Sequence, residues 1–200
     1  MCYLKLLLFP FLLLLGFNMT DSKLYPSRWL ITKGCTLKVE GSTTVNKFSC
    51  VISSNFSPDT LTFSRGGEGE SVRMTGSMKL DIREFNCHNS VMTADLRKTL
   101  KSKEYPRMKI RFISLNRYPE SSTRPYPVNG LVSIELAGVT RNFTVAYMVM
   151  PAGKNALFLK GMREINFSDF NIIPPRKIGG MIQTSDKLVA EFNLVLQELI

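Results

Sequence analysis

The chain has 200 residues, of which 44% are hydrophobic and 21% are charged, which is the composition of an ordinary globular protein. This length is enough to bury a substantial core without metal ions or a dense disulfide framework. Lys and Arg number 26 against 16 Asp and Glu, so the formal net charge is +10. The composition excludes disorder and predicts one basic, folded domain.

The N-terminus differs from the rest of the chain. Lys5 is followed by an almost unbroken apolar run from Leu6 to Phe17, which is shorter than the roughly 20 residues that cross a bilayer. We therefore expect residues 1–20 to be a signal peptide, residues 21–200 to form the domain, and the mature protein to be periplasmic or extracellular. No clear small-x-small cleavage site follows the run, which leaves retention as a membrane tether open.

From Trp29 onward the dominant hydrophobic period is two, which predicts β-strands with one face in a core and one in water. Runs of this kind lie at residues 46–52, 72–82, 107–112, 131–136 and 187–197. Turn residues separate them. Arg65–Gly69 predicts a loop, Ala137–Thr140 divides two runs of a hairpin, and residues 117–127 and 174–180 are irregular.

One segment has a helical period instead. Asn89 or Ser90 can cap a helix in which Met92, Leu96 and Leu100 recur every four residues before Pro106. This short amphipathic helix between strands is expected to cover one end of the fold.

Consecutive strands with clean alternation and one helix predict an all-β fold, a single closed antiparallel barrel of about eight strands. The interior of such a barrel can be filled by side chains or can hold one ligand. Periodicity does not decide between these two cases.

Catalytic and metal-binding motifs are not found in the sequence. The only histidine is His88, so it is the only histidine that could be the base for a serine or cysteine nucleophile. Because no second His accompanies it, no metal site or cofactor is expected. The basic residues between Arg97 and Arg117 are the outward half of an alternating strand and the polar side of the helix. With few aromatic residues beside them, they do not predict nucleic-acid binding.

Four segments, in order, resemble the YceI-like family of secreted bacterial proteins. They are Val39–Phe48, Met92–Phe112 with Tyr105-Pro106, Asn129–Arg141 with Gly138-Val139-Thr140, and Asn166–Asn171. The similarity runs from about Trp29 to Gln197. Two departures are visible: Asn46 stands where the family often has His, and Cys50 and Cys87 are not cysteine in the family at large.

The resemblance implies a lipocalin-like barrel with an elongated apolar cavity, in which some members bind polyisoprenoid chains. It therefore implies a non-enzymatic carrier whose ligand is an isoprenoid quinone, a polyprenyl lipid or a similar amphiphile. Some inward positions are expected to line the cavity and others only to form the core. The candidates are Met74, Met78, Leu80, Ile110, Phe112, Val132, Ile134, Phe143, Tyr147, Phe192 and Leu194.

A competing interpretation is a solidly packed interaction protein whose basic face binds an acidic envelope partner. In either case Lys98, Lys101, Lys109 and Arg111 are candidates for contact with an anionic membrane surface. The sequence leaves the oligomeric state open, a dimer included.

Three cysteines follow the predicted signal peptide: Cys35, Cys50 and Cys87. In an oxidising compartment one pair is expected to bond. We pair Cys50, which points inward from a strand, with Cys87, where the chain turns into the helix. One alternative is a Cys35–Cys50 bond, and the other is that all three cysteines are reduced, buried thiols.

Overall fold

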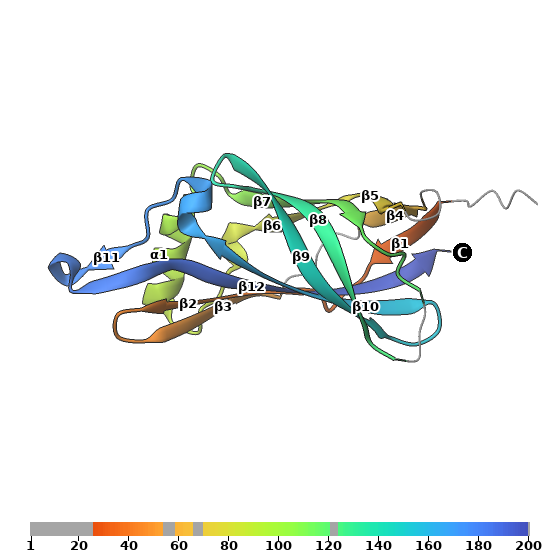
Figure 1. Ribbon diagram of the computed structural model, residues 1–200. Coiled ribbons are helices and arrows are strands. Elements are labelled where there is room, and N and C mark those ends of the chain that lie inside the picture. Colours follow the sequence, from red (N-terminus) through yellow and green to blue (C-terminus); the bar gives the residue numbers. More distant parts are fainter. Residues whose placement is uncertain (1–25, 54–58, 66–69, 121–123, 200) are drawn as a thin grey trace, which may run out of the picture.

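The computed structural model describes residues 26–53, 59–65, 70–120 and 124–199. The predicted signal peptide at 1–20 and most of the predicted loop at Arg65–Gly69 lie outside these ranges. Within them the chain forms strands joined by short turns, one α-helix and three 3-10 turns (Figure 1). The strands are β1 (Ser27–Ile31), β2 (Thr36–Thr43), β3 (Lys47–Ile52), β4 (Thr60–Ser64), β5 (Val72–Thr75), β6 (Ser77–Asp81), β7 (Arg107–Leu115), β8 (Tyr126–Leu136), β9 (Val139–Pro151), β10 (Ala156–Asn166), β11 (Arg176–Lys177) and β12 (Ile182–Leu199). The helix is α1 (Ser90–Thr99), and the 3-10 turns are η1 (Ile82–Glu84), η2 (Phe167–Phe170) and η3 (Ile178–Gly180).

Eight of the described strands pair in a closed antiparallel ring. The order is β1-β4-β5-β7-β8-β9-β10-β12, and β12 returns to β1 with Arg28 opposite Leu199 and Ile31 opposite Leu196. Closure leaves these eight strands without a free edge along the paired stretches. The predicted fold class, one closed antiparallel barrel with a single short helix, is confirmed.

In two places, one edge of a long strand pairs with two shorter strands in succession. The same edge of β12 pairs first with β1 and then with β2, and the same edge of β7 pairs with β5 and then with β6. Gly76, whose φ is +139°, separates β5 from β6. A Cβ at this position would lie 2.7 Å from the carbonyl oxygen of Thr60. The sequence predicts one strand over 72–82, and the structure bends it at the residue that lacks a side chain.

The barrel is split at the end where α1 lies. There, within the described ranges, β3 is paired in a ladder only with β2, and β6 only with β7. The gap between β3 and β6 is crossed by an isolated bridge between Val51 and Asn86 and is filled by α1, which lies at the left end in Figure 1. Asn89 caps the helix, because its Oδ1 accepts a hydrogen bond from the Met92 N–H at 2.9 Å. The predicted helix and its role as an end cover are therefore confirmed.

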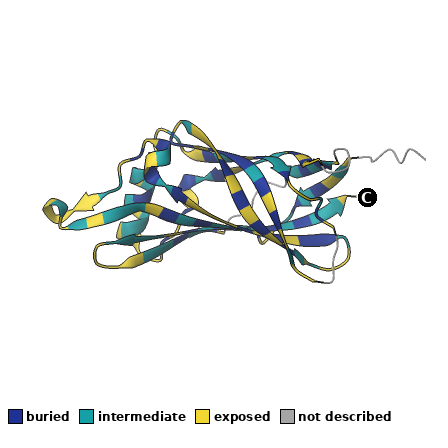
Figure 2. Cartoon of the chain, in the orientation of Figure 1, coloured by how far each residue is buried: buried dark blue, intermediate teal, exposed yellow. Residues whose placement is uncertain are grey.

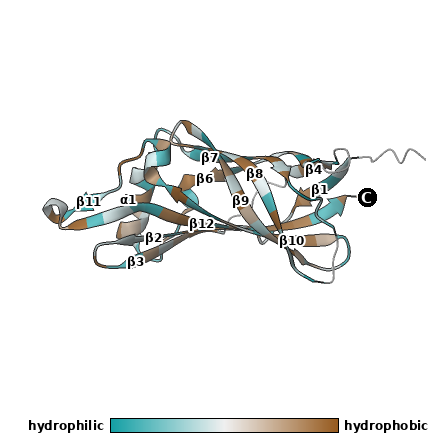
Figure 3. Cartoon of the chain, in the orientation of Figure 1, coloured by the Kyte–Doolittle hydropathy of each residue, from teal (hydrophilic) through white to brown (hydrophobic). Residues whose placement is uncertain are grey.

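Alternation along the strands produces the core. Buried and exposed positions alternate through β9 and β10 (Figure 2), and hydrophobic and hydrophilic residues alternate along the same walls (Figure 3). Ala137 and Gly138 join β8 to β9 with φ values of +50° and +79°, as a two-residue hairpin turn requires. Ser133 is at an outward position in the alternating run 131–136, but it is buried. The buried residues from all walls form one continuous cluster inside the barrel.

Candidate functional site

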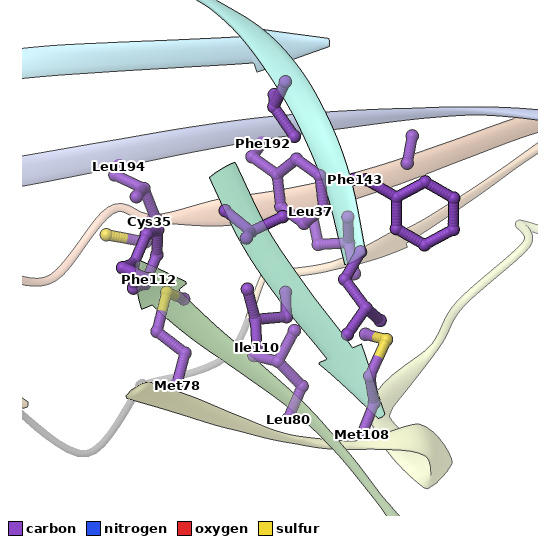
Figure 4. Close-up of a cluster of buried hydrophobic side chains, with 14 of the residues drawn as sticks. Cys35, Leu37, Met78, Leu80, Met108, Ile110, Phe112, Phe143, Phe192 and Leu194 are labelled. Atoms are coloured by element: carbon purple, nitrogen blue, oxygen red, sulfur yellow. The ribbon is translucent and has the colours of Figure 1, made fainter. Parts of the chain in front are cut away.

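The eleven predicted cavity residues all point into the barrel. Each of these side chains is buried, and Figure 4 shows several of them, among them Met78, Ile110 and Phe192, converging from different strands. The inward orientation that the hydrophobic period predicts is therefore correct. Whether these side chains contact a ligand remains a prediction.

Side chains fill much of the interior. A small cavity of about 40 Å³ lies near α1, far below the range of about 300–1,000 Å³ for small-molecule sites. Of the predicted cavity residues, Ile134 and Phe192 line it. Its wall is entirely apolar and is made by Leu37, Val39, Phe85, Leu96, Leu100, Met108, Ile134, Leu136, Ile165, Leu188, Ala190 and Phe192.

Tyr147 lies against the inner wall. A Cβ on Gly161, its direct partner on β10, would lie 2.4 Å from the Tyr147 ring, and one on Gly130 of β8 would lie 2.8 Å from it. The glycines thus leave the space that the ring occupies. Burial raises the pKa of the Tyr147 hydroxyl, and among the described residues no hydrogen bond to it is found.

A larger pocket of about 290 Å³ opens at the split end of the barrel, between α1, the β2–β3 hairpin and the start of β12. We call it the mouth pocket. Its volume is close to the lower end of the range of small-molecule sites, about 300–1,000 Å³. Most of its surface is apolar, with polar groups at intervals. The lining residues are Thr43, Val45, Asn46, Phe48, Cys50, Asn89, Val91, Met92, Asp95, Leu96, Thr99, Phe167, Pro175, Lys177, Ile182 and Thr184.

Leu96 lines both the mouth pocket and the interior cavity. It lies on the buried face of α1, four residues before Leu100, which lines only the cavity. Leu96 is therefore part of the wall of both spaces, and it is the one residue that the two linings share.

Polar side chains stand around the mouth pocket. Lys177 of β11 forms an ion pair with Asp95 of α1, which ties the β11 segment to the helix. Asn46, at the position where the resembled family often has His, lines this pocket. Its Oδ1 accepts a hydrogen bond from the Thr43 hydroxyl at 2.6 Å. These groups could hold the polar end of an amphiphile while the apolar floor holds its chain.

A disulfide anchors the start of α1 to the barrel. Cys50 of β3 is bonded to Cys87, with Cα atoms 3.9 Å apart, and this is the pairing expected from the sequence. Cys35 is a free, buried thiol. Its sulfur accepts a hydrogen bond from the Val195 N–H at 3.3 Å, and burial raises the pKa of the thiol, so Cys35 behaves as a small hydrophobic residue.

The predicted basic face is divided between two parts of the molecule. Lys98 lies on α1 and Lys101 just after it, at the split end. Lys109 and Arg111 lie on β7, in the side wall, where Lys109 is opposite Lys79 and Arg111 is opposite Ser77. Lys98 and Lys101 thus belong to the helix segment, and Lys109 and Arg111 belong to the barrel wall.

Sequence reasoning missed most of the mouth pocket. Asn46, Phe48, Phe167, Lys177 and Ile182 come from different elements far apart in the chain. The periodicity of a single strand gives no signal for such a juxtaposition. The apolar residues within 178–182, which belong to none of the alternating runs, are the signal that could have indicated a site at this end of the barrel.

Other classes of site find no support in the described ranges. They contain no cluster of three His, Cys, Asp or Glu side chains that could hold a metal ion. His88 is exposed and lines only a shallow polar depression with Asn86 and Arg97. Among these same residues, no helix has the length and apolar character needed to cross a bilayer.

Comparisons with known proteins identify the fold. Neither a scan against protein-family models nor a search of curated proteins found a match. Among solved structures, a polyisoprenoid-binding domain from Saccharophagus degradans, implicated in plant cell wall breakdown, superposes with a TM-score of 0.61 at 12% identity, over 86% of this chain and 99% of that one. BcnA of Burkholderia cenocepacia has a TM-score of 0.60 at 14% identity, over 80% and 95%. A YceI protein of Campylobacter jejuni has 0.49 at 15%, over 73% and 84%. The predicted fold is thus confirmed, because the chain has the barrel of the Saccharophagus degradans domain and of BcnA.

Proposed function

We propose that this protein is a non-enzymatic binder of a long apolar amphiphile, such as a polyprenyl lipid or an isoprenoid quinone. The observation that carries the proposal is the mouth pocket, which shares Leu96 as a lining residue with an apolar cavity in the interior. A solved structure with the same fold is described as a polyisoprenoid-binding domain, which supports the choice of ligand.

The chain of the ligand would enter beside α1 and displace Leu96. Each CH₂ group moved from water into an apolar site contributes about 0.8 kcal/mol. Binding therefore gains affinity with chain length and needs few polar contacts. The interior must widen to admit a long chain, and Met78 and Met108, which lie among the converging side chains (Figure 4), are the residues best able to repack because methionine is unbranched and flexible. The polar end would remain at Asn46, Thr184 and the Asp95–Lys177 pair.

The test is a matched pair of tryptophan substitutions on α1. Leu96→Trp places an indole between the pocket and the interior, whereas Ala94→Trp places it on the exposed face of the same helix. Geranylgeraniol and ubiquinone are titrated against both folded variants and the wild type. We expect at least roughly tenfold weaker binding for Leu96→Trp and no change for Ala94→Trp, since only the first obstructs the apolar path. Equal affinities in all three proteins, or no binding to the wild type, would refute the proposal.

A solidly packed interaction protein is the second candidate, and the small size of the interior cavity favours it. It predicts that neither probe binds and that the protein elutes from an anionic resin only at high salt, without extractable lipid. The lipid titration and the elution experiment together distinguish the two.

Export of the chain is part of the proposal and is supported by the apolar run at Leu6–Phe17 and by the disulfide. The intact mass of the protein from its natural source should correspond to a chain that begins near residue 21. A mass that includes Leu6–Phe17 would instead indicate a retained tether.

A further inference from the structure

We propose that the rim of the mouth pocket docks onto an anionic lipid bilayer, with the tips of its turns inserted among the headgroups. The rim is defined by four exposed apolar side chains: Val45, Val91, Ile178 and Met181, whose exposed fractions are 68, 61, 66 and 77%. The purpose that we assign to docking, which is the transfer of a lipid into the pocket, rests on the proposed function. The docking itself is measured separately.

The four side chains come from three segments that meet around one opening. Val45 in the β2–β3 turn and Val91 on α1 both line the mouth pocket. The β2–β3 turn also contacts the tip before β12, because the Thr44 hydroxyl donates a hydrogen bond to the Met181 carbonyl at 3.2 Å. Single exposed apolar residues are normal on a protein surface. A group that surrounds an apolar pocket is typical of an interaction site.

Apart from its hydrogen bonds with the β2–β3 turn, the tip between β11 and β12 is largely uncovered in the described part of the chain. A Cβ added to Gly179 or Gly180 would meet no atom within 4 Å, and the tip is the outermost part of the split end, drawn as exposed in Figure 2. The rim consists of two projecting turns, which the Thr44–Met181 hydrogen bond joins, and the start of α1. This shape suits insertion into the soft headgroup region of a bilayer better than contact with a flat protein surface.

The charge around the rim selects anionic lipids. Lys47 follows the β2–β3 turn, Arg176 lies on β11, and Lys98 shares the exposed face of α1 with Val91, seven residues before it. Within the described ranges none of these three cations is found in an ion pair, whereas Asp95 is paired with Lys177. Basic side chains beside inserted apolar ones are the combination that binds negatively charged membranes. Docked in this way, the pocket would open directly toward the lipids.

The first experiment compares vesicle binding of two double variants. Ile178→Ser with Met181→Ser removes two rim side chains, and Phe158→Ser with Met162→Ser removes two exposed apolar side chains from the outer wall of β10. Each protein is sedimented at low salt with vesicles of phosphatidylcholine containing one third phosphatidylglycerol. We expect the wild type to bind, the rim variant to bind roughly tenfold more weakly and the wall variant to bind as the wild type does. A wild type that does not bind, or equal binding of both variants, would overturn the proposal.

The second experiment tests the charges in the same way. Lys47→Glu with Arg176→Glu should weaken binding at low salt far more than Lys109→Glu with Arg111→Glu, which changes the side wall by the same charge. Equal losses would mean that the overall charge, and not the rim, attracts the protein to the vesicles.

Two controls separate this inference from its alternatives. Sedimentation velocity without vesicles shows whether the rim variant converts a dimer to a monomer, in which case the rim is a contact between two copies and the bilayer proposal is wrong. Geranylgeraniol binding in solution should be unchanged in Ile178→Ser with Met181→Ser, because neither residue lines the mouth pocket. Loss of vesicle binding with retained geranylgeraniol binding supports docking. Vesicle binding by a wild type that takes up no geranylgeraniol leaves docking standing and refutes the proposed function.

Discussion

At the scale of residues, the interior is shaped by one aromatic ring and the glycines beneath it. The Tyr147 ring occupies the space over Gly161 and Gly130 that side chains would otherwise take. Such an arrangement allows a bulky residue to lie flat on a strongly curved wall. The glycines are needed for the space they leave, since neither has a positive φ.

Gly161→Ala should destabilise the protein by about 1–3 kcal/mol, the usual cost of overpacking a core. The reason is that the new methyl group would lie 2.4 Å from the Tyr147 ring. The same substitution made together with Tyr147→Leu should cost clearly less, because the ring that it strikes is gone. Urea denaturation of the four proteins in this cycle measures both costs. Equal costs in the two backgrounds would show that the ring is not the obstacle.

Tyr147 should also make the barrel sensitive to high pH. Burial raises the pKa of its hydroxyl, so the native state keeps a proton that the unfolded chain loses above about pH 10. Its contribution to the free energy of unfolding is complete below that pH and is lost as the pH rises through the native pKa. Tyr147→Phe should match the wild type at pH 7 and lose less stability above pH 10. Parallel curves for both proteins would contradict this assignment.

At the scale of elements, α1 replaces a strand pairing. The ladder is not continued between β3 and β6, and the helix fills that gap while the disulfide holds its start against β3. The mouth pocket lies between this helix, the β2–β3 hairpin and the start of β12.

Replacing both Cys50 and Cys87 with Ala should lower the free energy of unfolding by about 3–4 kcal/mol, from the entropy of closing a loop between positions 37 apart. Cys35→Ala is the control and should cost less, because it removes only a small buried side chain. Thermal unfolding with and without a reductant measures the effect of the disulfide and of the control substitution. A wild type whose melting temperature is unaffected by complete reduction would rule out a stabilising role for the bond.

The sequence predicted the elements better than the space between them. The period of two identified the inward face of β6, β7 and β12, because each inward side chain is set by its own strand. The helix cap at Asn89 is equally local, and the Cys50–Cys87 pair followed from an inward strand position and a chain turn. The bend at Gly76 was missed, since glycine fits both a straight strand and a kink. The mouth pocket depends on long-range packing among α1, the β2–β3 hairpin and β12, which no local pattern encodes.

At the scale of the whole molecule, the barrel has two unlike ends. At one end β1 and β4 complete the ring of strands with the end of β12, and the other end carries α1, the mouth pocket and the exposed rim (Figure 1). The net charge of +10 draws the protein toward anionic surfaces in general. In the proposed docking, the exposed apolar rim determines which end of the barrel faces the membrane. A carrier with this polarity would meet a membrane with its pocket first.

The most direct test of the central claim is native mass spectrometry of the protein isolated, without detergent, from the cells that produce it. A binder of long apolar amphiphiles should retain a ligand, seen as a mass above that of the mature chain and released by organic extraction as a polyprenyl lipid or an isoprenoid quinone. Leu96→Trp should be recovered without that mass and Ala94→Trp with it. A wild-type protein that is free of lipid after this isolation, and that takes up neither geranylgeraniol nor ubiquinone, would contradict the account.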